Sequence, residues 1–319
     1  MSCLGILSVV ARKLRIEYPG AVYHVMSRGD RREPVFNGEQ DYELFLRTLE
    51  EACGKAHWQV HAYCLMRNHF HLVVETPRPT LVAGMKWLLG TYTARFNRRR
   101  RQFGHLFSGR YKALVVEGSG DGYLKTVCDY VHLNPVRAKL IEAGQPLEAF
   151  RWSSYPLYLA GPRRRPPWLR VDRLLGEWRI GRDSAAGRRA LGEGMERRRQ
   201  EDLTGEFKPV ERGWCLGGEG FRSELLEQVT RSPGTSHYGD AVQEAVADRA
   251  ERMVKGRLKA MGWTEQDLAA RRKGDAAKVK LAASVRAETT MPLAWVAERL
   301  RMGSRGYLAW LLHRQGKPA

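Results

Sequence analysis

Hydrophobic residues follow strand-like and helix-like spacings through the first 140 residues of the chain. Four short runs rich in β-branched and aromatic residues predict strands. Three longer segments carry apolar residues every three to four positions and predict helices, the last of which is disturbed by Pro135. In chain order, the elements are expected as a strand at 21–27, a helix at 38–56, strands at 58–65 and 69–75, a helix at 80–98, a strand at 111–117 and a helix at 123–140.

This order of elements predicts an α+β fold, a ferredoxin-like antiparallel sheet with helices on one face. The segment 159–170 is rich in proline and arginine, as linkers are, and the segment 187–205 is dense in charge. We therefore expect the chain to have several parts. They are an N-terminal tail at 1–13, a sheet domain at 14–158, a basic connecting region at 159–240 and an all-α domain at 241–319.

The sequence of the last part, residues 241–319, predicts a helical domain. Apolar residues have helical spacing over 278–287, and Thr290 can cap a following helix with Pro292 in its first turn. After a turn at Gly303, Ser304 can cap a last helix, which gives the helix-turn-helix pattern of DNA-binding proteins. An ordinary helical hairpin is the alternative. The basic residues that favour DNA binding there are Arg301, Arg305 and Arg314.

The charge of the chain favours a polyanionic partner. Lysine and arginine number 54 against 35 acidic residues, which gives a formal net charge of +19. Nucleic acid is the leading class of partner, because binding to phosphates releases condensed counterions. A merely basic surface is the alternative.

The cysteines and the hydrophobic runs indicate a cytoplasmic protein. The five cysteines form no CxxC pair and fit no zinc pattern, which suits reduced thiols. The apolar run near the N-terminus has no positive charge before it and is too short to span a bilayer. We therefore expect no membrane association.

The stretch NHFHLVVE places two histidines on one face of a predicted strand. Residues i and i+2 of a strand project from the same face, so His69 and His71 point together, while Phe70 and Leu72 point to the other face. Alone, the pair could bind a metal or be structural. Glu75 shares the face but lies roughly 13 Å from His71 along the strand, too far to complete the same site.

The segment CDYVHLNPVRA places Tyr130 and Asn134 four residues apart, on one face of a helix. Two imidazoles and an amide oxygen could bind a divalent cation that polarises a phosphodiester while Tyr130 attacks phosphorus. Alternatively, Tyr130 lies at the edge of the core and Asn134 is a cap, since a residue before proline disfavours the helical conformation.

The segment ARFNRRRRQFGHLFSGRYK, residues 94–112, mixes basic and aromatic side chains. Such a mixture fits single-stranded nucleic acid, in which bases stack and phosphates are neutralised. A solvated charged face is the alternative. Together with basic residues near the first strand, the hairpin and the last helix, the candidate DNA-binding residues are Arg28, Arg31, Arg32, Arg67, Arg95, Arg98, Arg99, Arg100, Arg101, Arg110, Lys112 and Arg305.

Several motifs, in this order, resemble the REP-associated tyrosine transposases, bacterial relatives of the single-tyrosine HUH transposases of IS200-type elements. They are YPGAVYHVMSRGDRREPVF, YCLMRNHFHLVVE, GHLFSGRYKALVV and DYVHLNPVRA, and FRWSSYPLYLAG continues the likeness. The resemblance covers residues 14–175. The tail from residue 240 resembles, more weakly, the duplex-DNA-binding domain of the bacterial replication initiator.

The resemblance implies an HUH endonuclease fold and a role in DNA transposition and recombination. It implies that His69, His71 and Asn134 bind Mg²⁺ or Mn²⁺ and that Tyr130 is the nucleophile. Such an enzyme cleaves single-stranded DNA hairpins of palindromic repeats and leaves a 5′-phosphotyrosine and a free 3′-OH. Arg67 replaces the family's usual proline and adds a phosphate-binding charge.

Several expectations stay open at this point. The enzyme would work near the bacterial nucleoid, as a monomer or a dimer, with its C-terminal domain on duplex DNA. The alternatives are a catalytically silent protein that binds DNA hairpins in a regulatory role, and a protein that binds RNA hairpins.

Overall fold

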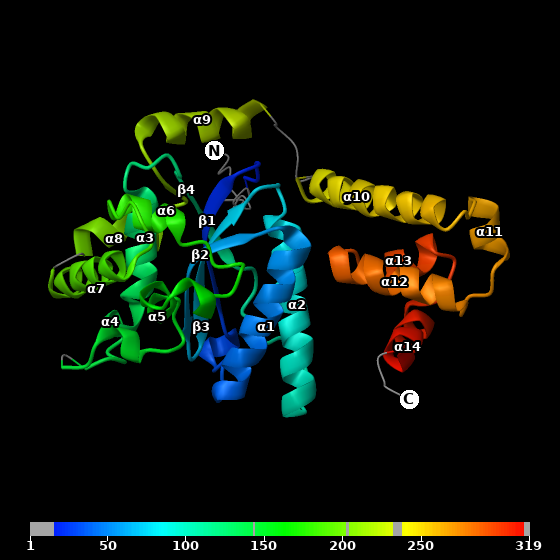
Figure 1. Cartoon of the computed structure of the whole chain (residues 1–319), viewed down its shortest axis with the longest axis horizontal. Coiled ribbons are helices and arrows are strands. Elements are labelled where there is room, and N and C mark those ends of the chain that lie inside the picture. Colours follow the sequence, from blue (N-terminus) through cyan, green and yellow to red (C-terminus); the bar gives the residue numbers. More distant parts are fainter. Residues whose placement is uncertain (1–15, 143, 202–203, 232–237, 316–319) are drawn as a thin grey trace, which may run out of the picture.

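The computed structural model describes residues 16–142, 144–201, 204–231 and 238–315 (Figure 1). The expected N-terminal tail and Cys3 lie outside the described residues. Among the described helices, none is long and apolar enough to cross a membrane.

A five-stranded mixed sheet forms the centre of the larger part of the molecule, with the strand order β2-β3-β1-β4-β5. The strands β1 (Ala21–Arg28), β2 (Gln59–Met66), β3 (His69–Thr76) and β4 (Lys112–Val116) pair in antiparallel fashion. β5 (Cys215–Leu216) joins β4 in parallel. The prediction of an antiparallel sheet is therefore correct for β1 to β4 and wrong at β5, because a strand of two residues has no periodicity to detect.

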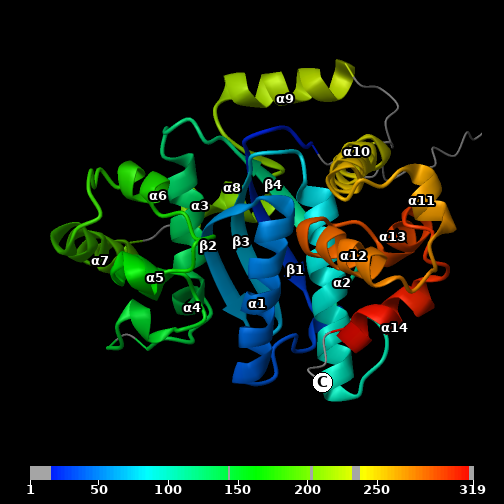
Figure 2. The same cartoon turned by 45° about the vertical axis from the view of Figure 1, so that its right-hand side comes forward.

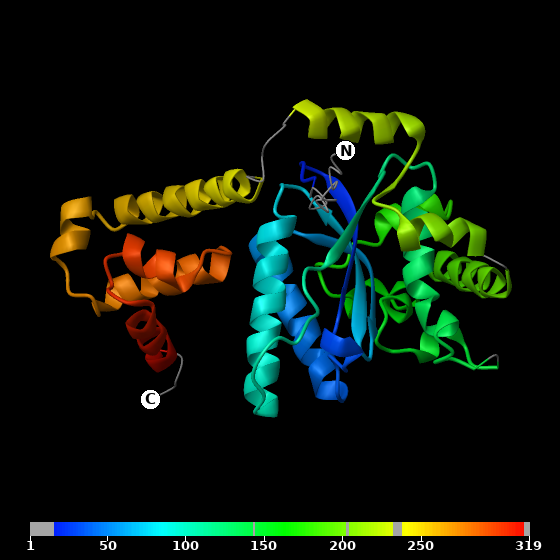
Figure 3. The ribbon, with the colours of Figure 1, turned by 180° about the vertical axis from the view of Figure 1, so that it is seen from behind.

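Helices cover both faces of this sheet, and the prediction of helices on one face is wrong (Figures 1 and 3). The helices α1 (Glu39–Ala56) and α2 (Leu81–Arg100) cover one face, and α3 (Tyr123–His132) lies on the other. The interior of β3 is buried on both sides, so each face needs its own layer. On the α1 face, Phe45 packs against Phe70, with ring centroids 4.8 Å apart.

The connecting region between the two expected domains is itself folded. Buried apolar residues such as Leu175, Phe207 and Leu225 join the same hydrophobic core as the sheet. The α-helices of residues 134–231 are α4 (Asn134–Arg137), α5 (Tyr155–Leu159), α6 (Asp172–Glu177), α7 (Ala185–Gln200), α8 (Thr204–Arg212) and α9 (Glu219–Arg231). Short 3-10 helices lie at Asp30–Arg32, Leu147–Ala149 and Pro162–Arg164.

The C-terminal part is helical (Figure 2). It has a second hydrophobic core, in which Val254, Leu281, Val296 and Leu308 are buried. It contacts the sheet domain where the Lys55 ammonium of α1 donates to the carbonyls of Arg286 and Ala287. The helices are α10 (Tyr238–Ala260), α11 (Glu265–Ala270), α12 (Ala276–Glu288), α13 (Leu293–Arg299) and α14 (Arg305–Gln315).

The predicted caps of the last two helices have different outcomes. Ser304 caps α14, since its Oγ accepts from the Tyr307 N–H at 3.2 Å. The N-cap of α13 is Pro292 and not the predicted Thr290. The neighbouring Thr289 instead bonds the Val285 carbonyl and ends α12, so the chain leaves that helix in extended form.

Candidate active site

Two adjacent strands bring three imidazoles together on the α3 face of the sheet. His69 and His71 begin β3, and their ring centroids lie 5.0 Å apart, as strand alternation predicts. His24 of β1 stacks on His71 at 5.2 Å, and its Nε2 lies 2.9 Å from Nδ1 of His71. The register pairs Met26 with His71, so His24 reaches His71 diagonally across the two strands.

These imidazoles are held in the neutral form that binds metal ions. Burial lowers the pKa of His24 to about 4, and burial together with Arg28 lowers the pKa of His69 to about 4. Burial, assisted by the neighbouring His24 and His69, also holds the pKa of His71 well below its ordinary value. His69 Nδ1 donates to the Asn68 side-chain oxygen at 2.7 Å, because that oxygen can only accept. Its Nε2 therefore keeps the lone pair that a metal ion would need.

Tyr130 lies directly beside the imidazoles. Its ring centroid is 5.7 Å from that of His71 and 5.6 Å from that of His24, in edge-to-face arrangements. Its side chain projects from α3, and only 8% of the residue is exposed. The sequence analysis paired Tyr130 with the histidines, and their side chains are in contact.

Asn134 lies four residues further along the chain. α3 ends at His132, and Asn134 begins α4 after a break at Leu133, next to Pro135. The Asn134 amide donates to the backbone carbonyl of Tyr130 at 3.5 Å, which leaves its side-chain oxygen as the atom that could bind a metal. In the part of the chain that the structure describes, no group of three His, Cys, Asp or Glu side chains could hold a metal ion. A cation here would use two neutral imidazoles and the Asn134 amide oxygen, a donor set that suits Mn²⁺ or Mg²⁺ less tightly than it suits later transition metals.

Sequence reasoning missed Arg137, which covers the ring of Tyr130. The guanidinium carbon lies 4.7 Å from that ring centroid, and the guanidinium forms an ion pair with Glu211 of α8. Burial lowers the pKa of Arg137, but hydrogen bonds to the side chains of Tyr130 and Glu211 outweigh this effect and the net shift is upward. The seven-residue spacing between Tyr130 and Arg137, about two helical turns, was a signal that could have found it.

Helix α8 was also missed, and it closes the site from the side opposite the sheet. Phe207 lies edge-to-face against Tyr130, with centroids 5.4 Å apart, and is itself buried. Glu206 accepts from Thr126 of α3 at 3.1 Å, which adds a second tie between α8 and α3. No sequence pattern could have placed His24 and Phe207 beside Tyr130. The position of His24 depends on strand register, and Phe207 lies about 80 residues from Tyr130 along the chain.

The candidate DNA-binding residues differ in their exposure and in whether a carboxylate already holds them. Arg28 lies opposite His69 in the β1–β3 register, beside the imidazoles. Arg95 is held by Glu51 at 2.7 Å, and Arg99 and Arg100 are held by the buried Asp41 at 3.6 and 2.7 Å. The candidates with exposed side chains and no ion pair in the described residues are Arg31, Arg32, Arg67, Arg98, Arg101, Arg110, Lys112 and Arg305, the last of these in the C-terminal part.

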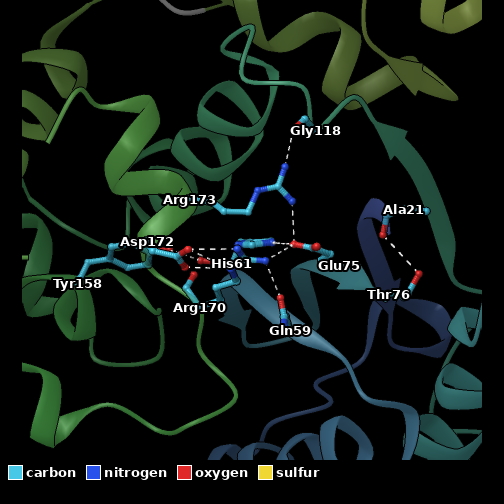
Figure 4. Close-up of polar contacts among 10 residues, drawn as sticks. All are labelled: Ala21, Gln59, His61, Glu75, Thr76, Gly118, Tyr158, Arg170, Asp172 and Arg173. Carbon is cyan, nitrogen blue, oxygen red and sulfur yellow. Dashed lines mark hydrogen bonds and ion pairs between the residues drawn. The ribbon is translucent and has the colours of Figure 1, made fainter. Parts of the chain in front are cut away.

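Glu75 takes part in a separate polar network at the other end of β3 (Figure 4). It accepts from His61 of β2 at 2.9 Å, from Arg173 at 2.7 Å and from Arg170 at 3.2 Å. Burial raises the pKa of this carboxyl, but the hydrogen bonds from His61 and Arg173 outweigh it and lower the pKa to about 2. Glu75 thus belongs to a structural ion cluster, as its distance from His71 predicted.

Comparisons with known proteins gave a family match and similar solved structures. Residues 18–134 match the model of the family described as "Transposase IS200 like" and include His69, His71, Tyr130 and Asn134. The chain therefore carries an IS200-like transposase domain over these residues. The solved structure of a REP-associated tyrosine transposase bound to a REP hairpin is similar, with a TM-score of 0.40 and 12% identity, over 50% of this chain and 97% of that chain. No curated protein matches the sequence.

Proposed function

We propose that this chain is a metal-dependent endonuclease and strand transferase that acts on single-stranded DNA hairpins through a 5′-phosphotyrosine. The observation that carries the proposal is the contact of Tyr130 with His71 and His24, inside a transposase-like domain. A phenol beside neutral imidazoles suits phosphoryl transfer, because its phenolate leaves more easily than an alkoxide and the bond can be rejoined.

The proposed roles are specific. His69, His71 and Asn134 would hold Mg²⁺ or Mn²⁺, which supplies Lewis-acid polarisation of the phosphodiester when bound. The Tyr130 oxygen forms the new bond to phosphorus, the bond to the 3′-oxygen breaks, and that oxygen ends as a 3′-OH. The phenol proton leaves to solvent. Arg137, beside the phenol, neutralises charge that develops on the phosphate oxygens.

The order of the elements supports an HUH endonuclease fold of ferredoxin-like type. β1, α1, β2, β3, α2 and β4 follow one another along the chain, and the strands lie in the order β2-β3-β1-β4. The palindromic hairpin as substrate rests on the resemblance of the sequence motifs. We propose that the HUH domain spans residues 14–158.

We propose that the C-terminal part, from residue 241, anchors the protein on duplex DNA through a helix-turn-helix formed by α13 and α14. Support comes from the short turn, where Gly303 has φ +87°, a value that glycine adopts at no steric cost. Arg305 begins α14, and Tyr307 and Trp310 of the same helix are exposed. A recognition helix needs such an exposed, basic face.

The second candidate function is a catalytically silent protein that binds hairpins. The burial of Tyr130 beneath Phe207 and Arg137 favours it, because a phosphodiester must reach the phenol oxygen before any transfer. The two functions differ in whether a covalent adduct forms.

The deciding experiment incubates the full chain and its Tyr130→Phe variant with end-labelled, single-stranded repeat hairpins, in Mn²⁺ or in EDTA. A protein–DNA band that survives denaturation, and that needs both the metal and Tyr130, is the expected result. Tight binding without an adduct across many hairpins would instead support the silent binder. Tighter binding of ribose-containing hairpins would favour an RNA ligand.

A further inference from the structure

A cavity of about 400 Å³ lies at the C-terminal end of α2, outside the imidazole cluster. Its wall combines apolar side chains with side-chain amides, the imidazole of His105 and the carboxylate of Glu33. The residues that matter are Phe96, Phe103, Leu106, Asn37, Asn97 and Gln102.

The cavity is connected to the candidate active site through the backbone. The N–H of Asp30 bonds the carbonyl of Leu106 at 3.0 Å, and the N–H of Ser108 bonds the carbonyl of Arg28 at 2.9 Å. Arg28 is the residue opposite His69 in the β1–β3 register. The loop that forms one wall of the cavity therefore lies against the strand end that carries the imidazoles, and one DNA strand could contact both places.

Phe103 is the unusual side chain of this wall, because 98% of it is exposed. A phenyl ring left in water has an unused stacking face, and exposed aromatic groups with basic neighbours mark single-strand binding surfaces. Arg98 and Arg101 beside it are exposed and have no ion pair in the described residues, unlike Arg99 and Arg100, which Asp41 holds. Positive charge thus directly neighbours the cavity-lining Asn97 and Gln102 in the sequence.

We propose that this cavity receives one unpaired nucleobase of a DNA strand, stacked on Phe103, while Arg98 and Arg101 contact the flanking phosphates. The amides supply both donors and acceptors, which can pair with the edge of a base. Asn97 is already oriented, since its amide donates to the carbonyl of Gly104 at 3.0 Å and leaves its oxygen for a ligand. The nature of the ligand rests on the proposed function, whereas the site itself is separate from the nucleophile.

The test uses the full chain with Tyr130→Phe, so that no covalent adduct interferes with the binding measurement. The probe is a fluorescein-labelled oligothymidylate of about 20 nucleotides, with 5-iodouracil in place of some thymines for cross-linking. Phe103→Ala is expected to weaken binding roughly 5- to 100-fold, the range for losing one base–aromatic stack. Phe103→Trp, which keeps a stacking face, is expected to bind within about twofold of the parent. Leu226→Ala removes an exposed apolar side chain of α9 and serves as the matched control.

The cross-link gives an independent result. Ultraviolet light should join the iodouracil to the peptide that contains Phe103, and mass spectrometry locates the joined residue. Unchanged affinity of Phe103→Ala, or a cross-link that maps outside residues 96–106, would overturn the site. Binding and cross-linking as expected, together with no covalent adduct between the unmodified chain and the repeat hairpins in Mn²⁺, would retain the site and reject the nuclease.

Discussion

Arg137 and Tyr130 form the side-chain pair on which the proposed chemistry depends most. The guanidinium of Arg137 lies over the phenol ring and forms an ion pair with Glu211 of α8. A phosphate that binds beside the phenol can replace Glu211 as the partner of this guanidinium. We expect Arg137→Gln to slow adduct formation roughly 100-fold, the usual loss when a donor to a developing oxyanion is removed. Hairpin binding should change much less, because many other basic groups attract the strand.

The first measurement is the single-turnover rate of adduct formation at a saturating concentration of hairpin. The second is the dissociation constant for the hairpin, measured with Arg137→Gln added to the Tyr130→Phe variant so that no adduct forms. Arg252→Gln on α10 makes the same change of charge at an exposed position and should leave the rate unaltered. Equal losses in the two variants would mean that only the net charge matters and that Arg137 has no special place beside the nucleophile.

At the scale of elements, α8 determines whether Tyr130 can be reached. Phe207 packs on the phenol, and Glu206 and Glu211 tie the helix to α3 and to Arg137. We expect Phe207→Ala to speed adduct formation several-fold, because α8 loses its main apolar contact with Tyr130 and opens more often. Phe221→Ala on α9, which removes a ring of the same size, should not change the rate. A slower reaction in Phe207→Ala would show that the helix organises the nucleophile and does not screen it.

The ion cluster of Glu75 fixes strands β2 and β3 to the segment that leads into α6, and its effect depends on pH. Because the pKa of the Glu75 carboxyl is lowered to about 2, its stabilisation is present above its usual pKa and is lost as the pH falls toward 2. We expect Glu75→Gln to lower the free energy of unfolding by about 3 kcal/mol at neutral pH. The difference should shrink steadily below about pH 4.5.

Urea unfolding at a series of pH values measures this directly. Glu148→Gln, at an exposed carboxyl, provides the control and should alter the free energy of unfolding little at any pH. A deficit of Glu75→Gln that stayed constant down to low pH would mean that the carboxylate charge contributes nothing and that only packing was lost.

The success of sequence reasoning also differs among the elements. The bounds of β1 to β4, α1 and α2 follow from local sequence, because runs of β-branched and aromatic residues mark the strands and apolar residues at helical spacing mark the helices. The break at Leu133, two residues before Pro135, follows from the chemistry of that proline, which cannot donate a backbone hydrogen bond to continue α3. β5, the cover of α8 over Tyr130 and the diagonal approach of His24 to His71 were not predictable, since each depends on residues far apart in sequence.

For the whole molecule, one buried ammonium group contributes to the placement of the C-terminal helices, together with the contacts of α10 with α2 and of α12 with α1. Lys55 donates to the carbonyls that end α12, where the helix dipole favours a positive charge, and burial lowers the pKa of this lysine. Each part has its own hydrophobic core, and the bonds of Lys55 join the two parts. We expect Lys55→Met, which keeps the aliphatic length but no donor, to weaken this docking by roughly 1.5–3 kcal/mol.

Small-angle scattering should then give a larger radius of gyration, and thermal unfolding should separate into two transitions. Lys280→Met on the exposed side of α12 removes the same charge and should change neither measurement. If the two parts stay docked in Lys55→Met, the contacts of α10 with α2 are sufficient to hold them. If they separate, hairpin cleavage should persist while any preference for hairpins beside duplex DNA declines, because the proposed duplex anchor would no longer be fixed relative to Tyr130.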